Sequence, residues 1–217
     1  MTYLQIINAV LDRLRETRVT ALDSNNAYLL MIGDFVNDAK RLVEAAGHEW
    51  THLRTEETIA LASGTDTYAI VGSGDSLFKM YNIWETTLPC ELRRVSGGQM
   101  KEWKVIAGTT GTPQYYAYKG IDAATGRYNI QLHPTPDAVL SLDVTYWAAQ
   151  DPLTDAEDIL KVPSLPVVLL ATAMAVKERG EVGNIQIQEV YDRADKALGD
   201  AISFDFGLTD EEKDWTP

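Results

Sequence analysis

One segment of the sequence has the spacing of a catalytic metal site. His48-Glu49-Trp50-Thr51-His52 matches the pattern H-E-x-x-H, in which two histidines one helical turn apart bind zinc and the glutamate polarises the metal-bound water. The pattern requires a continuous helix, but Gly47 precedes it at an expected helix end and the strand-like stretch 55–62 follows it. A zinc-dependent hydrolase using this motif therefore remains an alternative, and we predict no catalytic residue, no metal and no cofactor.

The other chemically suggestive features favour structural roles. The glycine loop Gly108-Thr109-Thr110-Gly111 lacks the following lysine of a phosphate-binding loop. The acidic cluster at 151–158 lacks the glycine and the spacing of a calcium loop. Cys90 is the only cysteine, so it forms no intramolecular disulfide; it fits a reducing compartment and is expected to be a structural thiol.

The charge balance argues against several classes of protein. The chain of 217 residues has 19 basic and 32 acidic residues, which gives a net charge of −13. Proteins that hold nucleic acid tightly neutralise phosphates with lysine and arginine, so specific DNA binding and attraction to anionic membranes are both disfavoured. The sequence contains no apolar run of the length that spans a bilayer and no signal-peptide pattern at its start.

Helical periodicity occurs near both ends of the chain. Thr2 and Gln5 have the spacing of a capping box, and Pro166 suits the first turn of a helix that is apolar nearly all round. The predicted helices cover residues 2–17, 24–46, 166–180 and 184–203. The predicted apolar face of the second helix comprises Tyr28, Ile32, Phe35, Ala39, Leu42, Val43 and Ala46.

Strand-like sequence separates the two helical regions. The clearest strand has Leu140, Leu142, Val144 and Tyr146 alternating with more polar positions, which predicts one buried face. We therefore predict an α+β protein, in which a four-helix bundle carries an inserted antiparallel β domain. The predicted parts are the bundle at 1–53 and 163–203, the β-rich insertion at 54–150, a linker at 151–162 and a C-terminal arm at 204–217.

A series of short motifs along the chain resembles a known family. The motifs, in order, are Gly64-Thr65-Asp66-Thr67-Tyr68, Gly111-Thr112-Pro113-x-x-Tyr116, Leu132-x-Pro134-x-Pro136-Asp137, Val144-x-Tyr146 and Leu165-Pro166. Their order and spacing over about residues 1–203 resemble the head-to-tail adaptor (head completion, or connector) proteins of tailed bacteriophages, a group that includes tail tubular protein A.

The resemblance implies a structural protein of the virion without catalytic activity. Family members have a helical bundle with a β-rich insertion and form a twelve-subunit (dodecameric) ring between the capsid portal and the tail or nozzle, through which DNA passes without specific binding. The chain would then lie at the head–tail interface of the virion, and in the host cytoplasm during assembly. A C-terminal arm would bind the portal through four apolar side chains, those of Phe204, Phe206, Leu208 and Trp215.

A third function remains open beside the ring component and the hydrolase. Aromatic residues are expected on the mixed face of the sheet, and aromatic side chains on a surface are typical of glycan- or receptor-binding modules. The residues concerned are Tyr116, Tyr118, Tyr128 and Trp147.

Overall fold

The structure is a computed structural model that describes residues 1–72, 77–87, 89–106, 108–180 and 184–209. The chain divides into two compact units, which are described separately. Residues 1–53 and 150–217 form the helical unit, and residues 54–149 form the β unit.

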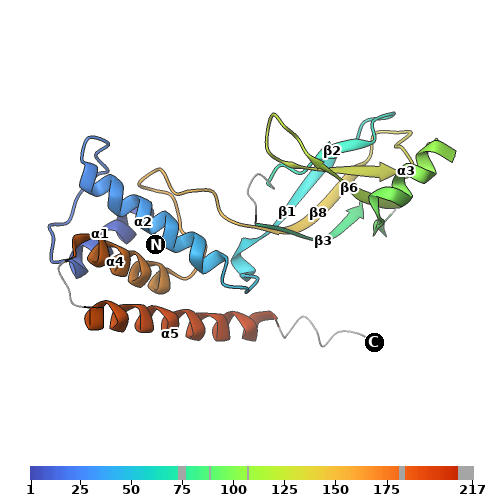
Figure 1. Ribbon diagram of the computed structural model, residues 1–217. Coiled ribbons are helices and arrows are strands. Elements are labelled where there is room, and N and C mark those ends of the chain that lie inside the picture. The colour runs from blue at the N-terminus through green and yellow to red at the C-terminus, as the bar shows by residue number, and fades with distance from the viewer. Residues whose placement is uncertain (73–76, 88, 107, 181–183, 210–217) are drawn as a thin grey trace. The chain divides into compact units, whose positions relative to one another are not determined.

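The described residues of the helical unit form four helices and one short 3-10 turn, and the four helices are labelled in Figure 1. The helices are α1 (Tyr3–Arg13), α2 (Ala27–Glu44), α4 (Ser164–Arg179) and α5 (Asn184–Thr209), and the 3-10 turn η1 covers Thr51–Leu53. The capping box predicted at the start of α1 is confirmed, because the Thr2 side chain accepts from the Gln5 amide and the Gln5 side chain accepts from the Thr2 amide. The cap of α2 is Asn26, and Gly47 has a φ of 78° just beyond its end.

The predicted four-helix bundle is wrong. The described residues form five helices, of which α3 (Gly97–Ile106) belongs to the β unit, and α1, α2 and α5 each pack against α4. Apolar residues nearly all round α4 allow it to be buried by several neighbours at once. In α5, by contrast, Ala194 and Asp205 are the only buried residues among the described side chains.

The buried face of α2 also differs from the predicted one. Leu42, which was expected inside, is 52% exposed, whereas Lys40 and Glu44 are fully or almost fully buried. The Lys40 ammonium lies 3.3 Å from a Glu44 carboxylate oxygen and donates to the Gln150 carbonyl, and the Gln150 amide donates to Glu44 over 3.1 Å. This buried ion pair therefore fixes the residue at which the chain returns to the helical unit.

The residues of the β unit that the structure describes form two four-stranded sheets and α3. One sheet has the order β1-β8-β3-β4 and is antiparallel, whereas the other has the order β2-β7-β6-β5 and contains a parallel β5–β6 pair, so the expectation of a purely antiparallel domain is also wrong. The strands are β1 (Arg54–Ala60), β2 (Thr67–Ala69), β3 (Phe78–Glu85), β4 (Cys90–Glu91), β5 (Arg93–Arg94), β6 (Tyr115–Ile121), β7 (Tyr128–His133) and β8 (Ser141–Ala148).

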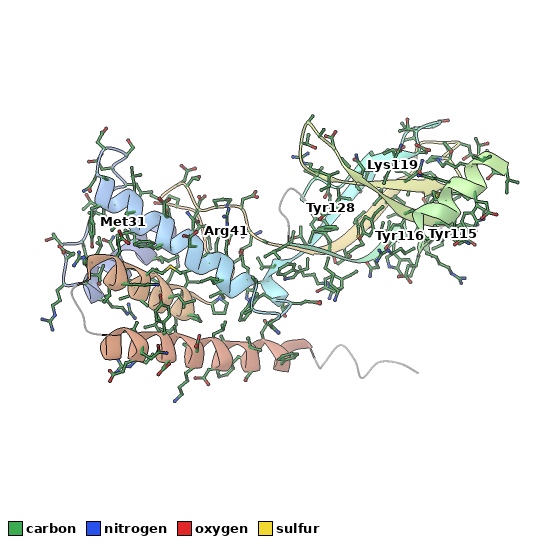
Figure 2. All side chains as sticks on the ribbon, in the orientation of Figure 1. Met31, Arg41, Tyr115, Tyr116, Lys119 and Tyr128 are labelled. Carbon is green, nitrogen blue, oxygen red and sulfur yellow. The ribbon has the colours of Figure 1, made fainter. Side chains whose placement is uncertain are left out.

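Both sheets contribute to one apolar cluster. Alternate residues Leu142, Val144 and Tyr146 of β8 are buried in it, as the sequence pattern predicts. Tyr115 and Tyr116 project from β6 and Tyr128 from β7 (Figure 2). Tyr116 and Trp147 are only 5% and 7% exposed, so these two aromatics, which were expected on a binding surface, are instead buried.

Candidate partner-binding site

The C-terminal part of α5 lies against the segment that follows α2. Helix α5 extends to Thr209, six residues past the predicted helix end, so Phe204, Asp205 and Phe206 are helical. Asp205 is 6% exposed although it lies between two exposed phenylalanines. Helical geometry explains the difference, because neighbouring residues point about 100° apart around the axis.

Asp205 joins α5 to the segment that contains the H-E-x-x-H motif. One of its carboxylate oxygens, Oδ2, lies 2.6 Å from Nε2 of His48 and accepts a 3.0 Å hydrogen bond from the Thr51 amide. An ionised carboxylate only accepts, so the His48 ring is assigned a proton on Nε2. We call this arrangement of Asp205, His48 and the Thr51 amide the α5 latch.

Aromatic rings surround the α5 latch. The His48 ring centroid lies 4.7 Å from that of Trp50, in an edge-on arrangement, and 4.7 Å from that of Phe206. Trp50 is 2% exposed and its indole N–H donates to the Val43 carbonyl near the end of α2. These contacts exclude water from the latch on two sides, which strengthens its hydrogen bonds.

The geometry of the motif differs from that of a zinc protease. His48 lies outside any helix and His52 lies in η1, so the two histidines are not one turn apart on one helix as the chemistry requires. The Nε2 atom of His48 is already bonded to Asp205. Among the described residues, no three metal-binding side chains come together. The motif therefore serves as a packing and hydrogen-bonding element.

A cavity of about 560 Å³ lies beside the α5 latch. Its walls are mostly apolar, and Phe204, which is 82% exposed, lies at its edge. The lining residues are Trp50, His52, Leu160, Lys161, Val162, Pro163, Ala201, Phe204 and Asp205. An exposed aromatic side chain next to an apolar cavity is typical of a surface that binds another protein.

The structure locates two of the four residues predicted to bind a partner. Phe204 and Phe206 are 82% and 54% exposed on the last turns of α5. The side chain of Leu208 and the whole of Trp215 lie outside the described residues. Sequence reasoning missed Asp205, because an acidic residue between two phenylalanines gives no sign that it is buried. It singled out His48, but as a candidate zinc ligand and not as a partner of Asp205.

None of the described helices has the length and apolar character needed to cross a membrane.

The family model of the SU10 adaptor protein matches residues 1–215, and no curated protein matches the chain. The family implies a structural rather than catalytic phage component that contacts portal and tail proteins as part of the virion. The match extends over almost the whole sequence, so the resemblance to phage head-to-tail adaptors is confirmed and the chain belongs to the SU10 adaptor protein family.

Proposed function

We propose that the protein forms a ring, dodecameric as the resemblance implies, that joins the capsid portal to the tail and surrounds the path of the DNA. Membership of an adaptor family supports the joining role. The observation that carries the proposal is the α5 latch, because it holds a helix end in place while Phe204 and Phe206 remain exposed.

A fixed helix end with exposed aromatic residues is suited to binding the surface of another protein. Aromatic side chains dominate the energy of many protein interfaces, and a helix end that is already held in place loses less conformational entropy on binding. The buried Asp205 carboxylate limits the movement of the last turns of α5. We therefore place the portal contact at Phe204 and Phe206, extended by Leu208 and Trp215.

The net negative charge of the chain is consistent with a ring through which DNA passes. A net charge of −13 repels the phosphate backbone over roughly one Debye length, about 8 Å at physiological salt. DNA would therefore pass such a ring without binding to it. The same charge makes copies of the chain repel one another, so a ring is expected to form on the portal rather than in isolation.

The proposal is tested by joining heads and tails in vitro. Particles assembled without this protein should accumulate as separate DNA-filled heads and tails, and added wild-type protein should restore infectivity. The Phe204→Ser variant should restore it poorly. The control is Ser203→Ala, which changes an exposed neighbour on the same turn of α5 and should restore infectivity fully.

Two results would contradict the proposal. Heads and tails that join without the protein would show that it is not the adaptor of the particle. Equal restoration by the phenylalanine variant and the wild type would show that the exposed end of α5 is not the portal contact.

A further inference from the structure

A second cavity in the helical unit has a different chemical character. Its volume is about 460 Å³, and it lies between the start of α1, the segment before α2, the first half of α2 and residues 152–154. The lining residues are Tyr3, Ile7, Leu22, Asp23, Ser24, Leu29, Leu30, Asp34, Asn37, Pro152, Leu153 and Thr154. We call it the Tyr3 cavity.

One asparagine side chain holds a wall of the Tyr3 cavity, and a second one holds a segment that leads to it. Asn37 of α2 accepts from the Leu153 amide over 2.8 Å and donates to the Leu153 carbonyl over 3.0 Å. Asn8 of α1 makes the same pair of hydrogen bonds with Val19, at 2.8 and 2.9 Å. Each asparagine therefore fixes an irregular segment to a helix, and the cavity is built before any partner arrives.

Tyr3 lines this cavity, and its hydroxyl has no hydrogen-bond partner among the described residues. Tyr3 is 7% exposed, and its hydroxyl oxygen lies so close to Gly33 that a Cβ there would be 2.3 Å away. Burial, followed by the charges of Asp34 and Asp158, raises the pKa of this hydroxyl. It therefore stays neutral near pH 7 and is free both to donate and to accept.

Negative charge and apolar walls occur together in the Tyr3 cavity. Its lining includes the carboxylates of Asp23 and Asp34 and no basic side chain. One Asp23 oxygen accepts from the Asn25 amide, whereas Asp34 is exposed and makes no hydrogen bond with its side chain within the described chain. Leu29 and the half-exposed Leu30 supply apolar wall. Such a cavity suits a ligand with an apolar stem and a cationic head.

We propose that the Tyr3 cavity binds an arginine side chain of a partner protein that differs from this chain. The planar guanidinium has five donors, which suit the Asp34 carboxylate and the Tyr3 hydroxyl together, while its alkyl stem lies along the leucines. Two copies that each carry a charge of −13 repel, whereas a basic partner is attracted, so the arginine belongs to another protein. The inference rests on the proposed function for its biological setting, in which that protein is a component of the head–tail joint.

The test uses the full-length protein and a small probe, N-acetyl-arginine methylamide, followed by NMR chemical shifts. The probe should shift signals of residues around the Tyr3 cavity, and its neutral isostere N-acetyl-citrulline methylamide should not. The Asp34→Asn and Tyr3→Phe variants should each weaken the probe's binding by about five- to tenfold. The control is Asp38→Asn, which removes the same charge from an exposed site on α2 outside the cavity lining.

Several results would overturn the inference. The first is equal chemical-shift changes with the arginine and citrulline probes. The second is unchanged binding of the arginine probe to Asp34→Asn. The third is a control variant, Asp38→Asn, that binds the arginine probe as weakly as Asp34→Asn does. Sedimentation of the pure protein tests the choice of partner: a lower mass for Asp34→Asn than for the wild type would assign the cavity to a second copy and refute a different partner.

The inference and the proposed function can fail separately. A protein that joins heads to tails but does not bind the arginine probe would refute the arginine site and leave the adaptor role intact. A protein that binds the probe as described but does not join heads to tails would support the arginine site and refute the adaptor role.

Discussion

Replacing Asp205 with alanine should release the end of α5 without unfolding the protein. The carboxylate makes both contacts of the α5 latch, 2.6 Å to Nε2 of His48 and 3.0 Å to the Thr51 amide. Apart from Asp205, Ala194 is the only buried residue among the described side chains of α5. Apart from the latch and the packing of Phe206 against the His48 ring, the last turns of the helix are largely exposed, so the effect should be local.

The size of this effect follows from the two hydrogen bonds. A hydrogen bond to a charged group contributes about 1.5–3 kcal/mol. Both bonds of Asp205 use the same oxygen, so their contributions add only partly, and the loss should be about 2–4 kcal/mol. Each 1.4 kcal/mol is a factor of ten in an equilibrium constant, so local opening should become about 30- to 1,000-fold more frequent.

Hydrogen exchange measured by mass spectrometry tests this prediction directly. Peptides from the last turns of α5 and from residues 48–53 should lose protection in Asp205→Ala, while peptides from α4 should not. The control is Asp200→Ala, which removes the same charge from an exposed position five residues earlier in α5.

Equal hydrogen exchange at the end of α5 in Asp205→Ala and Asp200→Ala would show that the Asp205 carboxylate does not hold this end of the helix. A loss of protection throughout the protein would equally contradict the prediction, because the latch would then support the whole core.

Three further substitutions test other parts of the structure. Glu44→Gln leaves the buried Lys40 ammonium without its counter-charge and should lower the free energy of unfolding in urea by about 3 kcal/mol. A Lys40→Met/Glu44→Leu double variant leaves no buried charge but removes the side-chain partners of the Gln150 carbonyl and amide, so its loss should be smaller but not zero; an equal loss in the two variants would contradict this. Burial and the neighbouring Glu57 carboxylate raise the pKa of Tyr146 from 10.0 to about 12, so this residue's contribution to stability is present below pH 10 and lost as the pH rises to 12. Between pH 10 and pH 12 the Tyr146→Phe variant should therefore lose less unfolding free energy than the wild type. An equal loss in both proteins would show that ionisation of Tyr146 does not cause the loss of stability. Gly33→Ala would place a methyl group 2.3 Å from the Tyr3 hydroxyl oxygen. The variant should lower the melting temperature despite the better helix propensity of alanine. A higher melting temperature would show that the Tyr3 ring moves aside at little cost.

Local patterns in the sequence predicted the elements that depend on nearby residues. The Thr2 and Gln5 capping box requires only neighbours along the chain, and the structure contains it. The alternation of β8 correctly identifies Leu142, Val144 and Tyr146 as buried, but Thr145 and Trp147 of the other face are buried as well. The helix at 166–180 was recognisable from Pro166 and its apolar residues, and α4 covers Ser164–Arg179.

The errors concern contacts between residues far apart in the sequence. In the sequence, Lys40 and Glu44 have the spacing of an exposed i,i+4 ion pair. In the structure both are buried and bind Gln150, which is more than one hundred residues away in the sequence. The same holds for Asp205 and His48, which are 157 positions apart. Helical periodicity indicates which residues form helices but not how those helices pack, and the four-helix bundle predicted from it is wrong, although α1, α2 and α5 each pack against α4.

Native mass spectrometry of the full-length chain, alone and mixed with the portal protein of the same phage, shows whether this chain binds the portal as a ring. The adaptor account predicts a species below ring size for the chain alone, and on the portal a complex with one closed ring of this chain. A chain that shows no binding to the portal at any ratio would contradict the account.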